Sequence, residues 1–131
     1  MAFVALTRIR LRSPHLLLPF MLHTGRALRF LRHAPGWVVT QTRKTRGLTF
    51  WFMSVWESAA DQRAHRGVGA PLVDLGKFRD WCEEIATAEW TQPSAEPPSW
   101  EQAEERLKNS ARLHRVEHPS PSQRAWMIST D

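Results

Sequence analysis

The stretch LTFWFMSVWES, residues 48–58, has the pattern of a strand that is apolar on both sides. Alternation places two sets of side chains on opposite sides, Thr49, Trp51, Met53 and Val55 on one and Phe50, Phe52, Ser54 and Trp56 on the other. A strand in a sheet with one solvated face carries polar residues on that face, so this strand needs a cover on each side. In a chain of 131 residues we expect the second cover to be another subunit.

Length and composition indicate one folded domain with a tail. The chain is 42% hydrophobic and contains seven Trp, which argues against disorder. Its single cysteine, Cys82, excludes an internal disulfide and a cysteine-based zinc site. We therefore expect a reducing, cytoplasmic compartment.

Charge is divided unevenly along the chain. The first 56 residues hold nine Lys or Arg and no acidic residue, whereas all thirteen acidic residues follow, for a formal net charge of +5. Such a division indicates either an anionic partner or two parts of one fold that attract each other.

The basic start is similar to a targeting sequence, but we do not expect one. The apolar run at residues 16–22 is too short to span a bilayer and contains Pro19, and residues 2–11 before it alternate like a strand. A basic amphipathic helix over residues 13–33, lying on a membrane surface, stays open as an alternative.

Periodicity predicts the order strand, helix, strand, strand, helix, strand. The expected strands are residues 2–11, 37–44, 48–56 and 84–92, and the expected helical segments are residues 13–33, 59–66 and 71–81. Pro19 implies a kink or a later start of the first helix. Ser58 with Asp61 resembles a capping box that opens the second.

The segment after residue 92 differs in composition. Three prolines form a linker, Ser99 is an N-cap, and the helix that follows carries an apolar stripe, Trp100, Ala103, Leu107 and Ala111. We therefore expect a domain at 1–92, with a linker, a helix and an extended tail at 93–131 packing on it.

This order is that of an α+β, ferredoxin-like βαββαβ unit, an antiparallel sheet with both helices on one face. Two such sheets packed face to face would make a dimeric α/β barrel. A homodimer follows from this expectation.

Several segments resemble a known family. They are TRIRLRS at 7–13, APG at 34–36, FW at 50–51, SVWES at 54–58, RDWCE at 79–83 and PSW at 98–100. Across residues 2–121 the chain resembles an uncharacterised bacterial family that is similar to the antibiotic-biosynthesis-monooxygenase-like dimeric α/β barrels, with a more distant likeness to spheroidene monooxygenases.

The resemblance implies a fold more than an activity, since that superfamily includes cofactor-independent monooxygenases, haem-degrading enzymes and members without known catalysis. The Asn, Trp and His of the haem-degrading branch fall near Thr7, His65 and Leu75, so none is matched. The resemblance also implies a His at the position that Pro71 occupies in this chain, and its absence argues against a shared His-dependent chemistry. We predict no cofactor, with haem or flavin left open.

Candidate site residues come from the histidines, arginines and aromatics of the expected barrel. His65 and His23 are candidate proton carriers, and Arg26 could bind a substrate anion. The candidate substrate pocket consists of Trp51, Trp56, Met53 and Phe52, although a core role is favoured for Trp51 and is an equal alternative for Trp56.

A metal site is not expected. The sequence HRVEH at 114–118 has the spacing of a metal pair on a helix, but it lies in the expected extended tail before a proline, where solvated histidines are the simpler interpretation.

Three functions remain open. The first is a monooxygenase-like enzyme acting on a small apolar or aromatic substrate. The second is a non-catalytic dimeric protein that binds a ligand or has a structural role. The third, ranked last, is a binder of nucleic acid or an anionic membrane through the basic half.

Overall fold

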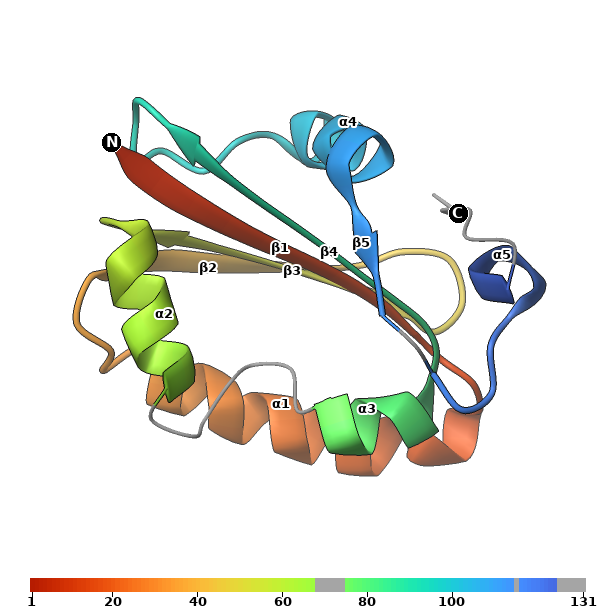
Figure 1. Cartoon of the computed structure of the whole chain (residues 1–131). Helices are drawn as coiled ribbons and strands as arrows, with labels where there is room; N and C mark the ends of the chain where they lie inside the picture. The colour runs from red at the N-terminus through yellow and green to blue at the C-terminus, as the bar shows by residue number, and fades with distance from the viewer. Residues whose placement is uncertain (68–74, 115, 125–131) are drawn as a thin grey trace.

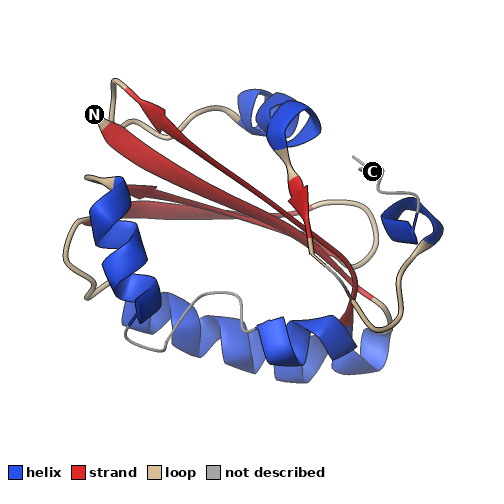
Figure 2. Cartoon of the chain, viewed as in Figure 1, coloured by secondary structure: helices blue, strands red, loops and turns tan. Residues whose placement is uncertain are grey.

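The chain folds as a five-stranded antiparallel sheet with helices on both sides (Figures 1 and 2). The computed structural model describes residues 1–67, 75–114 and 116–124. The elements in chain order are β1 (Ala2–Leu11), a 3-10 turn (Pro14–Leu16), α1 (Leu17–Leu31), β2 (Trp37–Lys44), β3 (Thr49–Trp56), α2 (Ala59–Gly67), α3 (Leu75–Trp81), β4 (Cys82–Gln92), α4 (Trp100–Ser110), β5 (Arg112–Leu113) and α5 (Pro121–Arg124).

The strand order is β2-β3-β1-β4-β5, with β1 at the centre. Thr7 of β1 faces Phe52 of β3 on one side and Thr87 of β4 on the other, which fixes the register of the three central strands. The α+β, ferredoxin-like expectation is confirmed. The sequence did not predict β5, which extends the sheet beyond β4.

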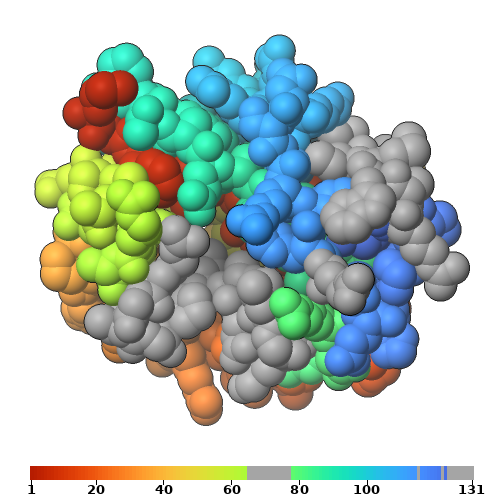
Figure 3. Space-filling view, viewed as in Figure 1, coloured from red at the N-terminus to blue at the C-terminus, as the bar shows by residue number. Residues whose placement is uncertain are grey.

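Helices α1, α2 and α3 cover one face of the sheet, the helix-facing side (Figure 1). Two apolar clusters lie beneath them. One gathers around Phe20, Phe52 and Phe78, and the other around Phe3 and Trp56. In the space-filling view the atoms of β1 are visible mainly near its N-terminal end, which agrees with its place in the middle of the sheet (Figure 3).

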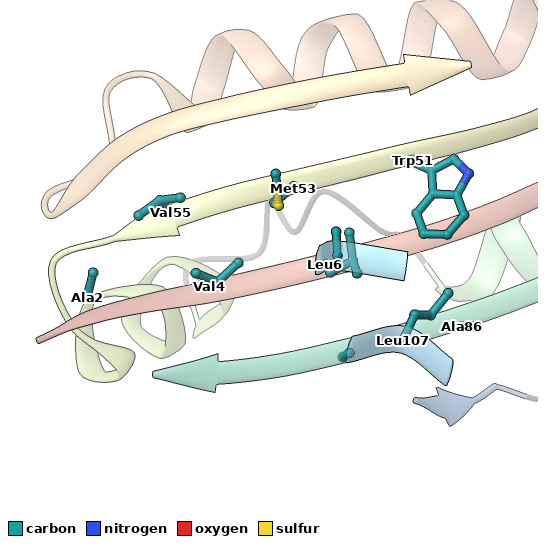
Figure 4. Close-up of a cluster of buried hydrophobic side chains, with 10 residues drawn as sticks. Ala2, Val4, Leu6, Trp51, Met53, Val55, Ala86 and Leu107 are labelled. Carbon is teal, nitrogen blue, oxygen red and sulfur yellow. The ribbon is translucent and has the colours of Figure 1, made fainter. Parts of the chain in front are cut away.

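The opposite face, the α4 side, is covered by α4 of the same chain. Its cluster contains Trp51, Met53 and Val55 of β3, each 0% exposed, packed with Leu107 of α4 (Figure 4). We expected another subunit to cover this face, and that expectation is corrected because α4 does so within one chain. The homodimer itself stays a prediction.

Local sequence explains why α4 forms and how it docks. The Ser99 hydroxyl accepts a hydrogen bond from the Gln102 backbone N–H, and the Gln102 side chain accepts one from the Ser99 N–H, so both ends of a capping box are present. Ala103 and Leu107, one turn apart, are both 0% exposed. The predicted apolar stripe is therefore the docking edge.

Helix α1 begins later than the first N-cap signal suggests. A 3-10 turn precedes it, and Pro19 falls within its first turn, where a missing backbone N–H costs no helical hydrogen bond. Of the two alternatives that Pro19 raised, a kink or a later start of the helix, the structure shows the later start. Among the described residues, no helix has the length and apolar character needed to cross a membrane.

Ion pairs join the basic first half to the acidic second half. They connect Arg10 to Glu83 at 2.9 Å, Arg43 to Glu104 at 2.7 Å, Arg12 to Asp80 at 3.5 Å and Arg8 to Glu84 at 2.6 Å. At these four positions, the basic first half and the acidic second half of the sequence form ion pairs within the fold.

The Arg8–Glu84 pair is buried. Arg8 is 1% exposed, and the second oxygen of Glu84 accepts a hydrogen bond from the Ser120 hydroxyl at 2.6 Å. An ion pair removed from water repays its desolvation only with such additional partners. The Ser120 contact also fixes the segment that follows β5 against the sheet.

The C-terminal segment is more ordered than expected. Residues 112–113, directly after α4, form β5, and residues 121–124, within the expected extended tail, form α5. Elements this short carry no periodic signal, which is why the sequence did not reveal them. The first residues of the predicted 71–81 helix and the apolar stretch 126–128 lie outside the described residues.

Truncating Leu107 tests whether α4 closes the sheet. Leu107→Ala should lower the free energy of unfolding by about 2–5 kcal/mol, because it opens a cavity beneath α4. Chemical denaturation measures the change, and Lys108→Ala, at the exposed neighbouring position, is the matched control. A loss no larger than that of the control would mean that α4 does not cover this face.

Candidate functional site

Three hydroxyl side chains form a polar row on the helix-facing side of the sheet. Thr7 and Thr87 are direct partners across β1 and β4, and Ser54 of β3 pairs with Ala5, two residues from Thr7 along β1. Paired residues on adjacent strands point to the same face, so Thr7, Thr87 and Ser54 lie together. Thr7 and Ser54 are buried and Thr87 is half-buried.

Aromatic side chains flank this polar row at both ends. Toward α3, Phe20 lies 5.6 Å from Phe78 and 6.2 Å from Phe52, measured between ring centroids. Toward α2, the Trp56 indole N–H donates to the Ser54 hydroxyl at 3.1 Å. The arrangement places uncharged hydrogen-bonding groups between two apolar walls, which is the character of sites for flat, mostly apolar molecules.

His114 stands at the edge of the polar row. Its Nε2 lies 2.8 Å from the Thr87 hydroxyl oxygen. Two hydrogen bonds of the His114 backbone fix the position of the residue. The His114 N–H donates to the Ile85 carbonyl at 2.9 Å, and the Gln123 side chain donates to the His114 carbonyl at 2.6 Å. The imidazole is thus held on the helix-facing side next to β4.

The surroundings of His114 lower its pKa and so favour the neutral form of its ring. Burial lowers the pKa of His114 below its ordinary value of 6.5, and the positive charges of Arg112 and Arg79 lower it further. A neutral imidazole has one nitrogen that can accept a proton. Half-buried and held against a hydroxyl group, His114 has the form of a general base.

Helix α2 contributes a further polar atom to the same side. Gln62 is 9% exposed, and its amide oxygen has no hydrogen-bond donor among the described residues. A buried acceptor without a donor is costly, so this atom is suited to a donor group supplied by a ligand. Sequence reasoning missed Gln62, because only its place in a helix was evident from the pattern.

The predicted pocket residues do not share one surface. Phe52 and Trp56 face the helices, whereas Trp51 and Met53 are buried beneath α4. Trp51 also has Arg43 over its ring at 4.9 Å, consistent with the core role that was favoured for it. Only Phe52 and Trp56 can border the polar row.

The predicted proton carriers are also dispersed. His23 on α1 is half-buried and meets Phe78 and Trp81 edge-on, with ring centroids 5.5 and 6.0 Å apart. Arg26, three residues along α1, is exposed. His65 lies on α2, but its side chain is outside the described residues.

The two histidines of HRVEH separate. His114 follows β5 and is hydrogen-bonded to Ile85 of β4, whereas His118 is exposed, with its Nε2 3.8 Å from an Asp80 carboxylate oxygen. The side chains of Asp80, Glu117 and His118 bring their ligand atoms within 4.8 Å of one another and could hold a cation. Asp80 is already paired with Arg12, so the cluster is accounted for by charge pairing.

Solved structures share this fold. SnoaB of Streptomyces nogalater, described as a cofactor-independent oxygenase, matches in a mutant form with a TM-score of 0.60 and 15% identity over 74% of this chain and 98% of its own. Rv0793 of Mycobacterium tuberculosis matches with a TM-score of 0.61 and 13% identity over 72% and 97% of the two chains.

A putative antibiotic biosynthesis monooxygenase from Nitrosomonas europaea gives a TM-score of 0.59 and 12% identity over 70% of this chain and 90% of its own. No family model and no curated protein sequence matches the chain. The chain has the fold of antibiotic-biosynthesis-monooxygenase-like proteins, as the resemblance in sequence implied.

The pKa of His114 provides a test of the site's electrostatics. In an NMR titration His114 should protonate below pH 6.5, and Arg112→Gln should raise its pKa by removing a nearby positive charge. Between the folded pKa and 6.5 the unfolded chain binds more protons, so the free energy of unfolding should rise with pH across that window. A titration at or above pH 6.5 would contradict the assignment.

Proposed function

We propose that this protein is a cofactor-independent monooxygenase-like enzyme that oxidises a small aromatic substrate on the helix-facing side of its sheet. The observation that carries the proposal is His114, a neutral imidazole 2.8 Å from the Thr87 hydroxyl, placed beside a polar row between aromatic walls. The fold supports it, because SnoaB, which shares the fold, is described as a cofactor-independent oxygenase.

Chemistry without a cofactor requires a substrate that itself reduces oxygen. A hydroxylated polycyclic aromatic with an acidic C–H group meets this requirement, because its carbanion is stabilised by the ring system. The enzyme must supply a base for the C–H proton, an apolar site that favours electron transfer to O₂, and groups that orient the ring.

His114 would take the proton from the substrate carbon, which leaves an imidazolium and a carbanion. The carbanion passes one electron to O₂, and the two radicals combine to a peroxide anion that takes back the proton from His114. Loss of water then converts the original CH₂ to C=O. One oxygen atom enters the product and the other leaves as water, so the reaction balances with O₂ as the sole oxidant.

The remaining groups would position the substrate. Thr87 orients the imidazole through its hydroxyl contact, and the Gln62 amide oxygen accepts a hydrogen bond from a substrate hydroxyl. Phe52 and Trp56 border a flat ring on either side of the polar row. Offset aromatic contacts of this kind favour planar, apolar substrates over aliphatic ones.

Oxygen uptake with anthrone as the probe tests this function. We expect catalysed uptake, one atom of ¹⁸O from ¹⁸O₂ in the anthraquinone product, and a fall in kcat of roughly 10²–10⁴ for His114→Gln. Gln can still form a hydrogen bond with Thr87 but cannot take up a proton, so a loss of activity would report proton transfer and not a loss of structure.

His118→Gln is the matched control, because His118 is 57% exposed and contacts Asp80 rather than the polar row. Uptake no faster than uncatalysed autoxidation of anthrone would contradict the proposal. Equal kcat values for His114→Gln and the unaltered protein would contradict the role of His114 as the base.

A further inference from the structure

The outward face of α1 carries most of the exposed apolar surface that the structure describes. Leu18 is 69% exposed, Leu22 57%, Met21 53% and Phe30 49%. The other exposed large apolar residues in the described part of the chain are Met1 and Val38. Helix α1 therefore carries four of the six exposed large apolar residues in the described part of the chain. Such a concentration on one helix is typical of an interaction site.

Helical geometry places the apolar residues together. Leu18, Met21 and Leu22 are spaced by three and four positions, so they share one face, while Phe20, Thr24 and Leu31 are buried. In Figure 1, α1 runs along the side of the molecule opposite α4, with no labelled element beyond it. Leu18, Met21 and Leu22 are each more than half exposed, so this part of α1 faces solvent.

Positive charge accompanies the apolar face. Arg26 and Arg29 lie on the second half of α1 and Arg32 follows its last residue, all three exposed. None has a carboxylate of the described residues within ion-pair distance, whereas Arg8, Arg10, Arg12 and Arg43 are all paired. Since residues 1–56 contain no acidic side chain, nothing on α1 offsets this charge.

We propose that α1 docks this protein on an anionic lipid bilayer. Leu18, Met21 and Leu22 would enter the boundary between headgroups and acyl chains, and Arg26, Arg29 and Arg32 would bind lipid phosphates. The 15 residues of α1 are about 22 Å long, short of the ~30 Å hydrocarbon core, so the helix lies along the surface.

Other occupants fit this face less well. A second copy docked through α1 would cover the leucines but offer no carboxylate to the arginines, because residues 1–56 contain no acidic side chain. Nucleic acid would engage the arginines but leave the leucines in water. A bilayer with anionic headgroups satisfies both kinds of side chain, and the inference does not depend on the proposed catalytic function.

Vesicle co-sedimentation tests the proposal with the full chain. The protein should bind vesicles containing about one third phosphatidylglycerol and not vesicles of phosphatidylcholine alone, and added salt should weaken binding. Replacing Leu18, Met21 and Leu22 together by Gln should lower the partition coefficient about tenfold or more. Arg26→Gln with Arg29→Gln should have a similar effect.

The control is Arg106→Gln with Lys108→Gln, which removes two exposed positive charges from α4 on the other side of the sheet. This variant should bind as the unaltered protein does, and thermal unfolding followed by circular dichroism checks that all variants are folded.

Three results would overturn the proposal. They are absence of binding to anionic vesicles, equal binding by the triple Gln variant, and self-association in solution that the triple variant abolishes. The last would assign the face to a second copy. Because the readout is lipid binding, none of these results bears on oxygen uptake.

Discussion

Both faces of the central sheet are apolar, and the fold depends on removing each of them from water. β3 alone sends Trp51 and Met53 to one side and Phe52 and Trp56 to the other. Each buried side chain of this size contributes roughly 1.5–3 kcal/mol. The chain meets the requirement with helices from its two ends, since α1 comes from the first third of the sequence and α4 from the last.

The two covered faces differ in electrostatics. Beneath α4, a full charge on Arg8 is neutralised by Glu84, whose other oxygen is occupied by Ser120. On the helix-facing side, the buried and half-buried polar groups of the central strands are hydroxyls beside the His114 imidazole, and the charged side chains of that face, Glu89 and Arg112, are exposed. On the α4 side, Arg8 and Arg43 each form an ion pair, although the Nε and Nη2 atoms of Arg8 have no hydrogen-bond partner among the described residues. The buried polar groups of the helix-facing side are uncharged, which suits an apolar aromatic molecule. This difference is why the proposed site lies on the helix-facing side.

Much of the fold could be predicted because its signals are local. Alternation from Thr49 to Trp56 indicated β3 and its two-sidedness, Ser99 indicated the start of α4, and the charge division anticipated the ion pairs. What covers the second face could not be predicted, because alternation tells that a face is apolar but not which segment reaches it. A four-strand unit with a linker and a helix is compatible with cover in cis or by a partner.

The site was harder to predict than the fold. His114 owes its position to β5, a two-residue strand without periodicity. Its lowered pKa comes first from burial and then from the charges of Arg112, two residues before it, and of Arg79, and both burial and the approach of Arg79 arise only through tertiary packing. The division of the predicted pocket was foreseeable, since Trp51 and Phe52 are adjacent in a strand and must point to opposite faces. Aromatic content predicted a pocket but could not indicate on which face it would lie.

Methionine oxidation tests most directly whether one chain covers both faces. Met53 lies beneath α4 and is 0% exposed, whereas Met21 on α1 is 53% exposed and serves as an internal reference. The protein is treated with dilute hydrogen peroxide at concentrations where light scattering shows a monomer, and sulfoxide is measured by peptide mass spectrometry. Oxidation of Met21 with lasting protection of Met53 is the predicted result. Oxidation of Met53 at a rate approaching that of Met21 would show that α4 does not close the face and that a partner is needed.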